Sequence, residues 1–181
     1  MTTADHAFTL RRLVDPGDAE LAALADVLVD CVDGGASVSF MPPLTRDRAL
    51  GFWQRVAEDV REGKRAVIVA EDDAGICGTV QLVLDLPENQ PHRAELVKML
   101  VHRRARRRGL AATLMRAAES TALEYGRNLL VLDAVTGGDG ERLYSRLGWQ
   151  RVGVIPRFAL MPDGTECSTT FFYRDLGALS T

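Results

Sequence analysis

The sequence predicts a mixed α/β domain in which helices pack on a sheet of about seven strands. Apolar segments of strand-like composition alternate with segments of helical periodicity, and glycine- and proline-containing turns separate them. Near the middle of the chain, a basic loop that contains one glycine joins a strand to a helix. At 181 residues the chain is long enough to bury a substantial core, so we expect a single domain over residues 1–181.

The first half of the chain carries signals for a strand, two helices and a hairpin. The turn at 15–18 begins the first helix and Gly34 follows its end, whereas Gly63 ends the second helix. The turn at 72–75 connects two apolar runs as a β-hairpin. The expected elements are a strand at 8–13, a helix from the turn to about Val32, a helix from its cap Thr45 to about Glu62, and strands at 65–71 and 76–84.

The second half of the chain alternates strands with helices and finishes on two strands. Gly126 and Gly148 follow the two helices as end signals, and the turn at 161–164 separates the last strands. The expected elements are strands at 95–101 and 128–134, helices at 110–125 and 140–147, and strands at 149–155 and 167–174. This order predicts one mixed sheet with helices packed on it.

Composition places the chain among soluble globular proteins. Hydrophobic residues make up 46% and charged residues 26%, and the formal net charge is −3. No apolar run approaches the ~18 residues that a membrane-spanning helix needs. The N-terminal residues MTTADHAF lack the apolar core of a signal peptide. We therefore expect a cytoplasmic protein without a membrane partner.

The cysteines and histidines are too widely separated in the sequence for a metal site. They are Cys31, Cys77 and Cys167, and His6, His92 and His102. An odd number of distant cysteines also does not fit a disulfide framework, which favours a reducing compartment. The sequence thus predicts no metal cofactor.

The loop between the strand at 95–101 and the next helix predicts an anion site. Its sequence is VHRRARRRGLAA over residues 101–112, and Gly109 opens the helix. The first amides of a helix have no acceptor inside the helix, and the helix dipole adds positive charge there. We expect a phosphate-bearing ligand at Arg106 to Ala112, with Arg106, Arg107 and Arg108 contacting phosphate oxygens. A solvated basic run or a nucleic-acid-binding patch is the alternative.

The loop and the order of elements resemble the GCN5-related N-acetyltransferase (GNAT) superfamily. The cofactor motif of that superfamily is Arg or Gln, two residues, Gly, one residue, then Gly or Ala, which here is Arg106 to Ala111. The segments DGGASVSFM, AELVKMLV, LLVLDA, LYSRLGWQRVGVIP and MPDGT resemble the tabtoxin-resistance branch of this superfamily. The resemblance implies a mostly antiparallel sheet of about seven strands flanked by about four helices, and acetyl-CoA as cosubstrate.

The resemblance also implies the residues that hold acetyl-CoA. A backbone amide of the fourth strand, near Leu100 or Val101, would bind the acetyl oxygen, and a splay between the fourth and fifth strands would admit the pantetheine arm. The implied cofactor-binding residues are Met99, Leu100, Val101, Arg106, Arg107, Arg108, Gly109, Leu110, Ala111 and Ala112.

Two carboxylates and one tyrosine are candidate catalytic residues. Glu95 opens one strand and Asp133 ends the next, and such charged positions are costly unless paired, solvated or functional. The resemblance makes them an acid/base pair beside the acceptor amine and makes Tyr144 the donor that protonates the departing thiolate. The plain structural alternatives are an ion pair of Glu95 with Lys98 or Arg93, a strand-end turn at Asp133, and packing of Tyr144 on the sheet.

The loop after the first helix is the expected acceptor-binding segment. Gly34, Gly35 and Ser37 lie in it, with Phe40 as a possible wall; an ordinary connection between helices would have a similar sequence. These features together predict acetyl transfer from acetyl-CoA to a small-molecule amine by direct attack, in a monomer or homodimer. A protein N-terminus or lysine is the alternative acceptor. A non-catalytic acyl-CoA sensor and a nucleic-acid-binding module are the alternative functions.

Overall fold

The computed structural model describes residues 8–177, which form one seven-stranded sheet in the order β1-β2-β3-β4-β5-β7-β6. The strands are β1 (Thr9–Leu13), β2 (Arg65–Asp72), β3 (Gly75–Val83), β4 (Arg93–Val101), β5 (Leu129–Val135), β6 (Gln150–Leu160) and β7 (Glu166–Asp175). The helices are α1 (Asp18–Asp33), α2 (Arg46–Arg61), α3 (Leu110–Glu124) and α4 (Asp139–Arg146), with a short 3-10 turn at Arg103–Ala105.

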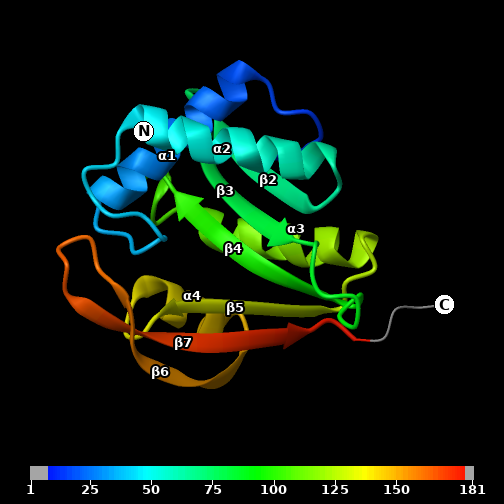
Figure 1. The fold of residues 1–181 in the computed structure, drawn as a ribbon. Helices are drawn as coiled ribbons and strands as arrows, with labels where there is room; N and C mark the ends of the chain where they lie inside the picture. The colour runs from blue at the N-terminus through cyan, green and yellow to red at the C-terminus, as the bar shows by residue number, and fades with distance from the viewer. Residues whose placement is uncertain (1–7, 178–181) are drawn as a thin grey trace, which may run out of the picture.

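The sheet is antiparallel except where β4 and β5 run parallel. This arrangement is the GNAT-type mixed fold that the sequence predicts, so the expected fold class is confirmed. Figure 1 shows α1 and α2 over one face of the sheet, with α3 behind the opposite face. Parallel neighbours need a crossover connection, and α3 supplies it between β4 and β5.

Two hydrophobic clusters, one on each face, hold the helices to the sheet. On the α1 and α2 face the cluster is centred on Trp53 and Leu28, which are fully buried. On the α3 and α4 face it is centred on Leu114, Met115 and Phe172. Both faces of the central strands are covered, so β2 and β3 are buried along most of their length and show no alternation of buried and exposed residues.

The β4–β5 pairing is short, and this shapes the functional part of the molecule. The two strands are in register only at Arg93 with Leu129, Ala94 with Leu130 and Glu95 with Val131. Beyond these pairs β4 stays paired with β3 and β5 stays paired with β7, while β4 and β5 diverge from each other. The expected splay between the fourth and fifth strands is therefore present.

Several element boundaries differ from the sequence expectation. β4 begins at Arg93 and β6 continues to Leu160, because long-range pairing with β5 and β7 extends both strands beyond their local apolar signal. The N-cap of α1 is Gly17, whose amide donates to Glu20 Oε2 at 2.8 Å. The expected domain ends at residues 1 and 181, and the histidine at position 6, lie outside the described residues. Within the part that is described, no helix has the length and apolar character needed to cross a membrane.

Candidate active site

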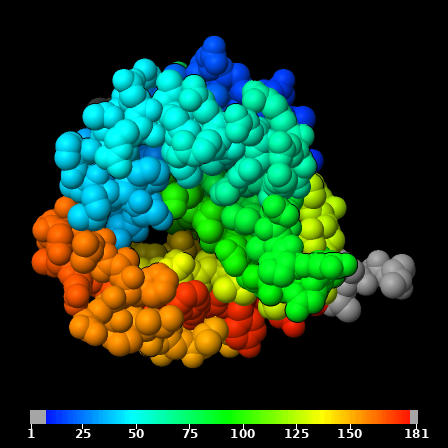
Figure 2. All heavy atoms as spheres, viewed as in Figure 1, coloured from blue at the N-terminus to red at the C-terminus, as the bar shows by residue number. Residues whose placement is uncertain are grey.

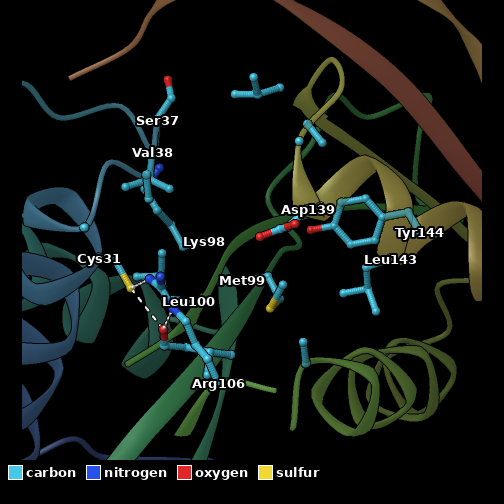
Figure 3. Close-up of a pocket in the computed structure, with 18 of the residues that line it drawn as sticks. Cys31, Ser37, Val38, Lys98, Met99, Leu100, Arg106, Asp139, Leu143 and Tyr144 are labelled. Carbon is cyan, nitrogen blue, oxygen red and sulfur yellow. Dashed lines mark hydrogen bonds between the residues drawn. The ribbon is translucent and has the colours of Figure 1, made fainter. Parts of the chain in front are cut away.

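A cleft with a volume of about 1150 Å³ lies where β4 and β5 diverge. Its walls come from β4, β5, the loop after α1, the start of α3 and the helix α4. Figure 2 shows this face of the molecule hollowed between the cyan α2 region and the yellow and orange C-terminal half. Figure 3 shows Lys98 and Val38 on one side of the cleft and Tyr144 on the other.

A β-bulge in β4 forms the floor of the cleft. Thr79 of β3 is in register with Leu100 and Gln81 with Val97, so Lys98 and Met99 together oppose the single residue between them. Lys98 has φ of 50°, a left-handed conformation that is uncommon for a residue with a side chain. The bulge therefore redirects the strand at the point where its β5 neighbour has already left it.

The start of α3 forms one end of the cleft and has the features of an anion site. Gly109 is the N-cap with φ of 77°, and Thr113 N donates to Gly109 O as the first bond of the helix. The amides of Leu110, Ala111 and Ala112 therefore precede that bond and lack an intrahelical acceptor. A Cβ on Gly109 would meet no protein atom within 4 Å, so the space beside these amides is open.

The basic loop uses several of its arginine side chains inside the protein. Arg106 Nε donates to Val101 O at 3.0 Å, and its Nη2 lies 3.9 Å from Cys31 Sγ (Figure 3). Arg103 pairs with Asp30, and Arg104 pairs with Asp72 at 3.2 Å. The loop is thus fixed by internal contacts, in contrast to a freely solvated basic run.

Nine of the ten expected cofactor residues line the cleft, and Arg108 does not. The Arg108 guanidinium lies 4.3 Å from the centroid of the Phe8 ring, away from the cleft wall. Arg142 and Arg146 of α4 line the cleft as well, and Arg142 donates to Gly137 O at 2.6 Å. Positive charge at this end therefore comes partly from α4, which the loop sequence alone does not reveal.

Asp133 lies near the end of β5, where it borders both the cleft and a smaller adjoining pocket. The hydroxyl of Thr169, on β7, donates to Asp133 Oδ2 at 2.7 Å. Thr169 is 3% exposed, so its hydroxyl holds one carboxylate oxygen from the buried side. The remaining acceptor capacity of Asp133 faces the cleft.

Glu95 shares a face of the sheet with Asp133 but is not part of the cleft wall. It is in register with Val131, two residues before Asp133, and side chains two residues apart in a strand point to the same face. Its carboxylate pairs with Arg93 Nη1 at 3.0 Å, and its side chain is 44% exposed. The structure thus shows the alternative ion pair with Arg93 and does not place Glu95 among the residues that line the cleft with Asp133.

Tyr144 lies on α4 and both packs and faces the cleft. Its ring centroid lies 6.1 Å from that of Trp149 and 6.0 Å from that of Phe172, and the residue is 6% exposed. Its hydroxyl points into the cleft in Figure 3. Burial, with a further contribution from the negative charge of Asp133, raises the pKa of Tyr144 to about 12. The phenol is therefore a proton donor throughout the neutral range.

The loop after α1 forms the remaining wall. Gly34, Gly35 and Ser37 line the main cleft, and Phe40 lines the adjoining pocket of about 410 Å³. Ser37 Oγ donates to Leu160 O at 2.9 Å, which ties the loop to the end of β6. The loop and the β6–β7 hairpin therefore line the smaller pocket, together with β5 around Asp133.

Comparison with protein families agrees with this geometry. Residues 63–151, which include the loop, α3 and β5, match the family model described as acetyltransferase (GNAT) domain.

The family model and the fold together support an N-acetyltransferase of the GNAT type.

Solved structures with the same fold share low sequence identity with this acetyltransferase. A ribosomal-protein-alanine N-acetyltransferase from Brucella melitensis has a TM-score of 0.77 at 21% identity, covering 93% of this chain and 99% of that one. A Salmonella typhimurium protein assigned as an acetyltransferase was solved with its cofactor acetyl-CoA. It has a TM-score of 0.76 at 18% identity, and the match covers 97% of each chain. A protein assigned as a phosphinothricin N-acetyltransferase has a TM-score of 0.74 at 19% identity, covering 95% of this chain and 100% of that one. These similarities show the fold, and the match of residues 63–151 to the family model is what adds support for an N-acetyltransferase.

The structure adds Lys98 to the charged residues of the cleft, whereas the sequence indicates it only as a partner for Glu95. Lys98 Nζ donates to Ser39 Oγ at 3.0 Å and lies 5.9 Å from the centroid of the Phe52 ring. The signal that could have found it is a lysine in the middle of the apolar run ELVKMLV. Among residues 8–177, no cluster of three His, Cys, Asp or Glu side chains is arranged to hold a metal ion.

Proposed function

We propose that this GNAT acetyltransferase transfers an acetyl group from acetyl-CoA to a primary amine of a small molecule. One observation carries the proposal: the free amides of α3, the carboxylate of Asp133 and the phenol of Tyr144 border one continuous cleft. The amides suit a diphosphate, whereas the carboxylate and phenol suit the two proton transfers of aminolysis.

The described residues fit acetyl-CoA at the α3 end of the cleft. The amides of Leu110, Ala111 and Ala112 would hold the diphosphate, and the open space beside Gly109 would accommodate it. The diverging edges of β4 and β5 would flank the pantetheine arm, because their peptide groups lack sheet partners there. Acetyl-CoA supplies the activated thioester whose acetyl group is transferred.

Asp133 is the proposed general base. An alkylamine is mostly protonated at pH 7, and it must lose a proton before it can attack a carbonyl carbon. The carboxylate attracts the ammonium form and accepts its proton, directly or through water. Thr169 keeps one Asp133 oxygen engaged, so that the other is left for the amine. Glu95, held by Arg93, is proposed as a secondary contributor to the negative field on this face.

Tyr144 is the proposed general acid. Because its pKa is about 12, the phenol remains protonated and can donate to the thiolate that leaves when the amide bond forms. The peptide amides of the β4 bulge, at Met99 and Leu100, would donate to the acetyl oxygen as negative charge develops on it.

The small size of the pocket beside Asp133, which we assign to the acceptor and call the acceptor pocket, favours a small acceptor over a protein. The pocket measures about 410 Å³, and the hydrogen bond from Ser37 to Leu160 closes one side of it. Similar structures include an enzyme named for a ribosomal protein and a protein assigned to the small molecule phosphinothricin, so fold similarity alone does not choose between these classes. The similarity to the tabtoxin-resistance branch, and a role in toxin resistance, remain part of this proposal.

Two other functions have less support. The basic loop of a nucleic-acid-binding module would leave its arginines free for phosphates, but Arg103 and Arg104 are engaged by Asp30 and Asp72. A non-catalytic acyl-CoA sensor has no use for a carboxylate and a phenol facing the same cleft.

Acetyl-CoA binding and coenzyme A release test the proposal directly. We expect calorimetry to show acetyl-CoA binding by the wild-type protein and thiol release in the presence of small amines. Asp133→Asn should lower turnover by about 100-fold or more without weakening acetyl-CoA binding. Glu95→Gln is the matched control, because it removes a carboxylate from the same face outside the cleft, and we expect a smaller decrease. Absence of acetyl-CoA binding, or unchanged turnover of Asp133→Asn, would contradict the proposal.

We also propose that residues 1–181 act as one catalytic domain in the cytoplasm, as a monomer or homodimer. The three cysteines are unpaired with one another, which is compatible with a reducing compartment. Size-exclusion chromatography with light scattering measures the oligomeric state.

A further inference from the structure

We propose that the acceptor is zwitterionic, and that Lys98 binds an anionic group of this acceptor while Asp133 receives its amine. The inference rests on the proposed acetyltransferase function and specifies the substrate class of the same site. Carboxylate and phosphinate or phosphonate groups are the anions that an ammonium in such a cleft would recognise. An amino acid or a close analogue has both charges on one small molecule.

The position of Lys98 is set by the β4 bulge. Its left-handed backbone, with φ of 50°, costs free energy for a residue with a Cβ, and such conformations persist only where the surrounding structure enforces them. The bulge turns the side chain to the face that carries Phe52 and Ser39. Figure 3 shows Lys98 entering the cleft from the side opposite Tyr144.

Lys98 forms no ion pair within 4.0 Å among residues 8–177. Its contacts are the neutral hydroxyl of Ser39 and the face of the Phe52 ring. Burial, reinforced by the nearby positive charge of Arg65, lowers the pKa of Lys98, and the negative charge of Asp133 opposes this effect. An ammonium in such surroundings gains from an anion that a ligand brings.

Opposite charges line the cleft from two different strands. Asp133 supplies negative charge at the end of β5, where the cleft meets the smaller pocket, whereas Lys98 supplies positive charge from β4 and is influenced by the nearby charge of Arg65 on β2. Arg65 itself is engaged by Asp59 and Gln81, so Lys98 is the cation left to contact a ligand there. A molecule with an amine at one end and an anion at the other would match this separation.

The composition of the chain makes Lys98 easy to isolate experimentally. The chain has two lysines among its 22 basic residues, and the other is Lys64, an exposed residue that pairs with Glu62 at 2.5 Å. Lys64→Met is therefore a matched control for Lys98→Met. It removes the same charge and adds the same side chain at a site outside the cleft.

The kinetic test compares α-amino acids with their α-carboxamides as acceptors in the thiol-release assay. For the best acid, the ratio of its kcat/KM to that of its amide should fall about 10- to 100-fold in Lys98→Met, through KM, and should not change in Lys64→Met. The acid and its amide differ in amine basicity, but this difference is the same for every variant and cancels when the ratio is compared between wild type and variant. Thermal melting and acetyl-CoA binding of both variants confirm that the fold is retained.

A second readout does not require turnover. Reductive ¹³C-methylation labels Lys64, Lys98 and the N-terminal amine, and the Lys98 signal should shift when the acids are added but not when their amides are added. The proposal is overturned if Lys98→Met keeps the preference for acids, if it lowers kcat equally for acids and amides as loss of a base would, or if no acid shifts the signal. If only amines without an anionic group are turned over, the proposed function stands and this inference alone is refuted. No thiol release with any amine would refute the proposed function itself.

Discussion

The hydroxyl of Thr169 on β7 donates a 2.7 Å hydrogen bond to the Asp133 carboxylate on β5. Thr169 also lies 3.0 Å from Ala134 O, so its hydroxyl is held by two groups of the neighbouring strand. Thr169 belongs to the most regular part of the sheet, because β5 and β7 are in register over seven consecutive pairs. The proposed base is thus oriented by a rigid element and not by a loop.

Removing this hydroxyl should impair turnover but not cofactor binding. In Thr169→Val, which keeps the shape of the side chain, we expect kcat to fall about 10-fold because the carboxylate loses an orienting hydrogen bond. Thr169→Ser should restore most of the activity. The measurements are steady-state kinetics and acetyl-CoA calorimetry, and equal losses in the serine and valine variants would show that packing, not the hydrogen bond, is what matters.

Tyr144→Phe should lower kcat and change the alkaline stability of the fold. The pKa of Tyr144 is about 12 in the folded protein and about 10 in an unfolded chain, so the folded state favours the protonated phenol. That contribution is fully present below about pH 10 and is lost as the pH rises through the folded pKa, with a maximum of about 3 kcal/mol. Between pH 9 and 12, denaturant unfolding should show a smaller loss of stability in the variant than in wild type.

Kinetics give the second readout for Tyr144. If the phenol protonates the thiolate, Tyr144→Phe should reduce kcat about 10- to 100-fold at pH 7, within the usual range for loss of a general acid. The packing against Trp149 and Phe172 does not require the hydroxyl, so the variant should fold normally. A variant with wild-type kcat would restrict Tyr144 to a packing role.

Gly109→Ala should weaken acetyl-CoA binding by about 10-fold or more, because its Cβ would project into the open space beside the α3 amides. Gly63→Ala is a matched control. Gly63 also has a left-handed backbone, with φ of 71°, and open space at the Cβ position, but it follows α2 outside the cleft. Both variants should lose about 1 kcal/mol of stability. Calorimetry measures the acetyl-CoA affinity of each variant. If Gly109→Ala and Gly63→Ala bind acetyl-CoA equally well, the diphosphate does not lie beside Gly109.

Asp30→Asn should loosen the turn that leads into the cofactor loop. Asp30 of α1 accepts from both the amide and Nε of Arg103, each at 2.8 Å, and its side chain is 10% exposed. Loss of the charge-assisted amide bond should cost about 1–3 kcal/mol and weaken acetyl-CoA binding a few-fold. Asp26 lies on the same helix as Asp30 and forms an exposed pair with Arg46 of α2, so Asp26→Asn should have little effect on melting or binding. Similar results for both variants would contradict a specific role of Asp30.

Much of the candidate site could be predicted because its signals are local. The anion site depends on Gly109 and the amides that follow it, and both properties belong to a short stretch of chain. Asp133 stands out for a comparable reason, since a carboxylate that closes an apolar strand is visible in the sequence. The predicted roles of these residues still await the experiments above.

The direction of each arginine in the basic loop could not be predicted. Arg106 points back to Val101 and Cys31, and Arg108 lies over Phe8. Their partners are distant in sequence, and a long flexible side chain takes its direction from whatever acceptor the fold places within reach. The ion pair of Glu95 with Arg93, by contrast, joins residues two apart, and the sequence indicates it as an alternative role for Glu95.

The sequence by itself determined the order of elements, the mixed α/β class and the loop that begins α3, because periodicity, turn residues and helix-end chemistry act over a few residues. Only the tertiary structure decided where β4 and β5 part, that Lys98 enters the cleft at a bulge, and that Thr169 orients Asp133. Strand pairing and register depend on residues far apart in the chain, and a shift of one residue moves every side chain to the other face. The cleft therefore exists only once all seven strands are assembled.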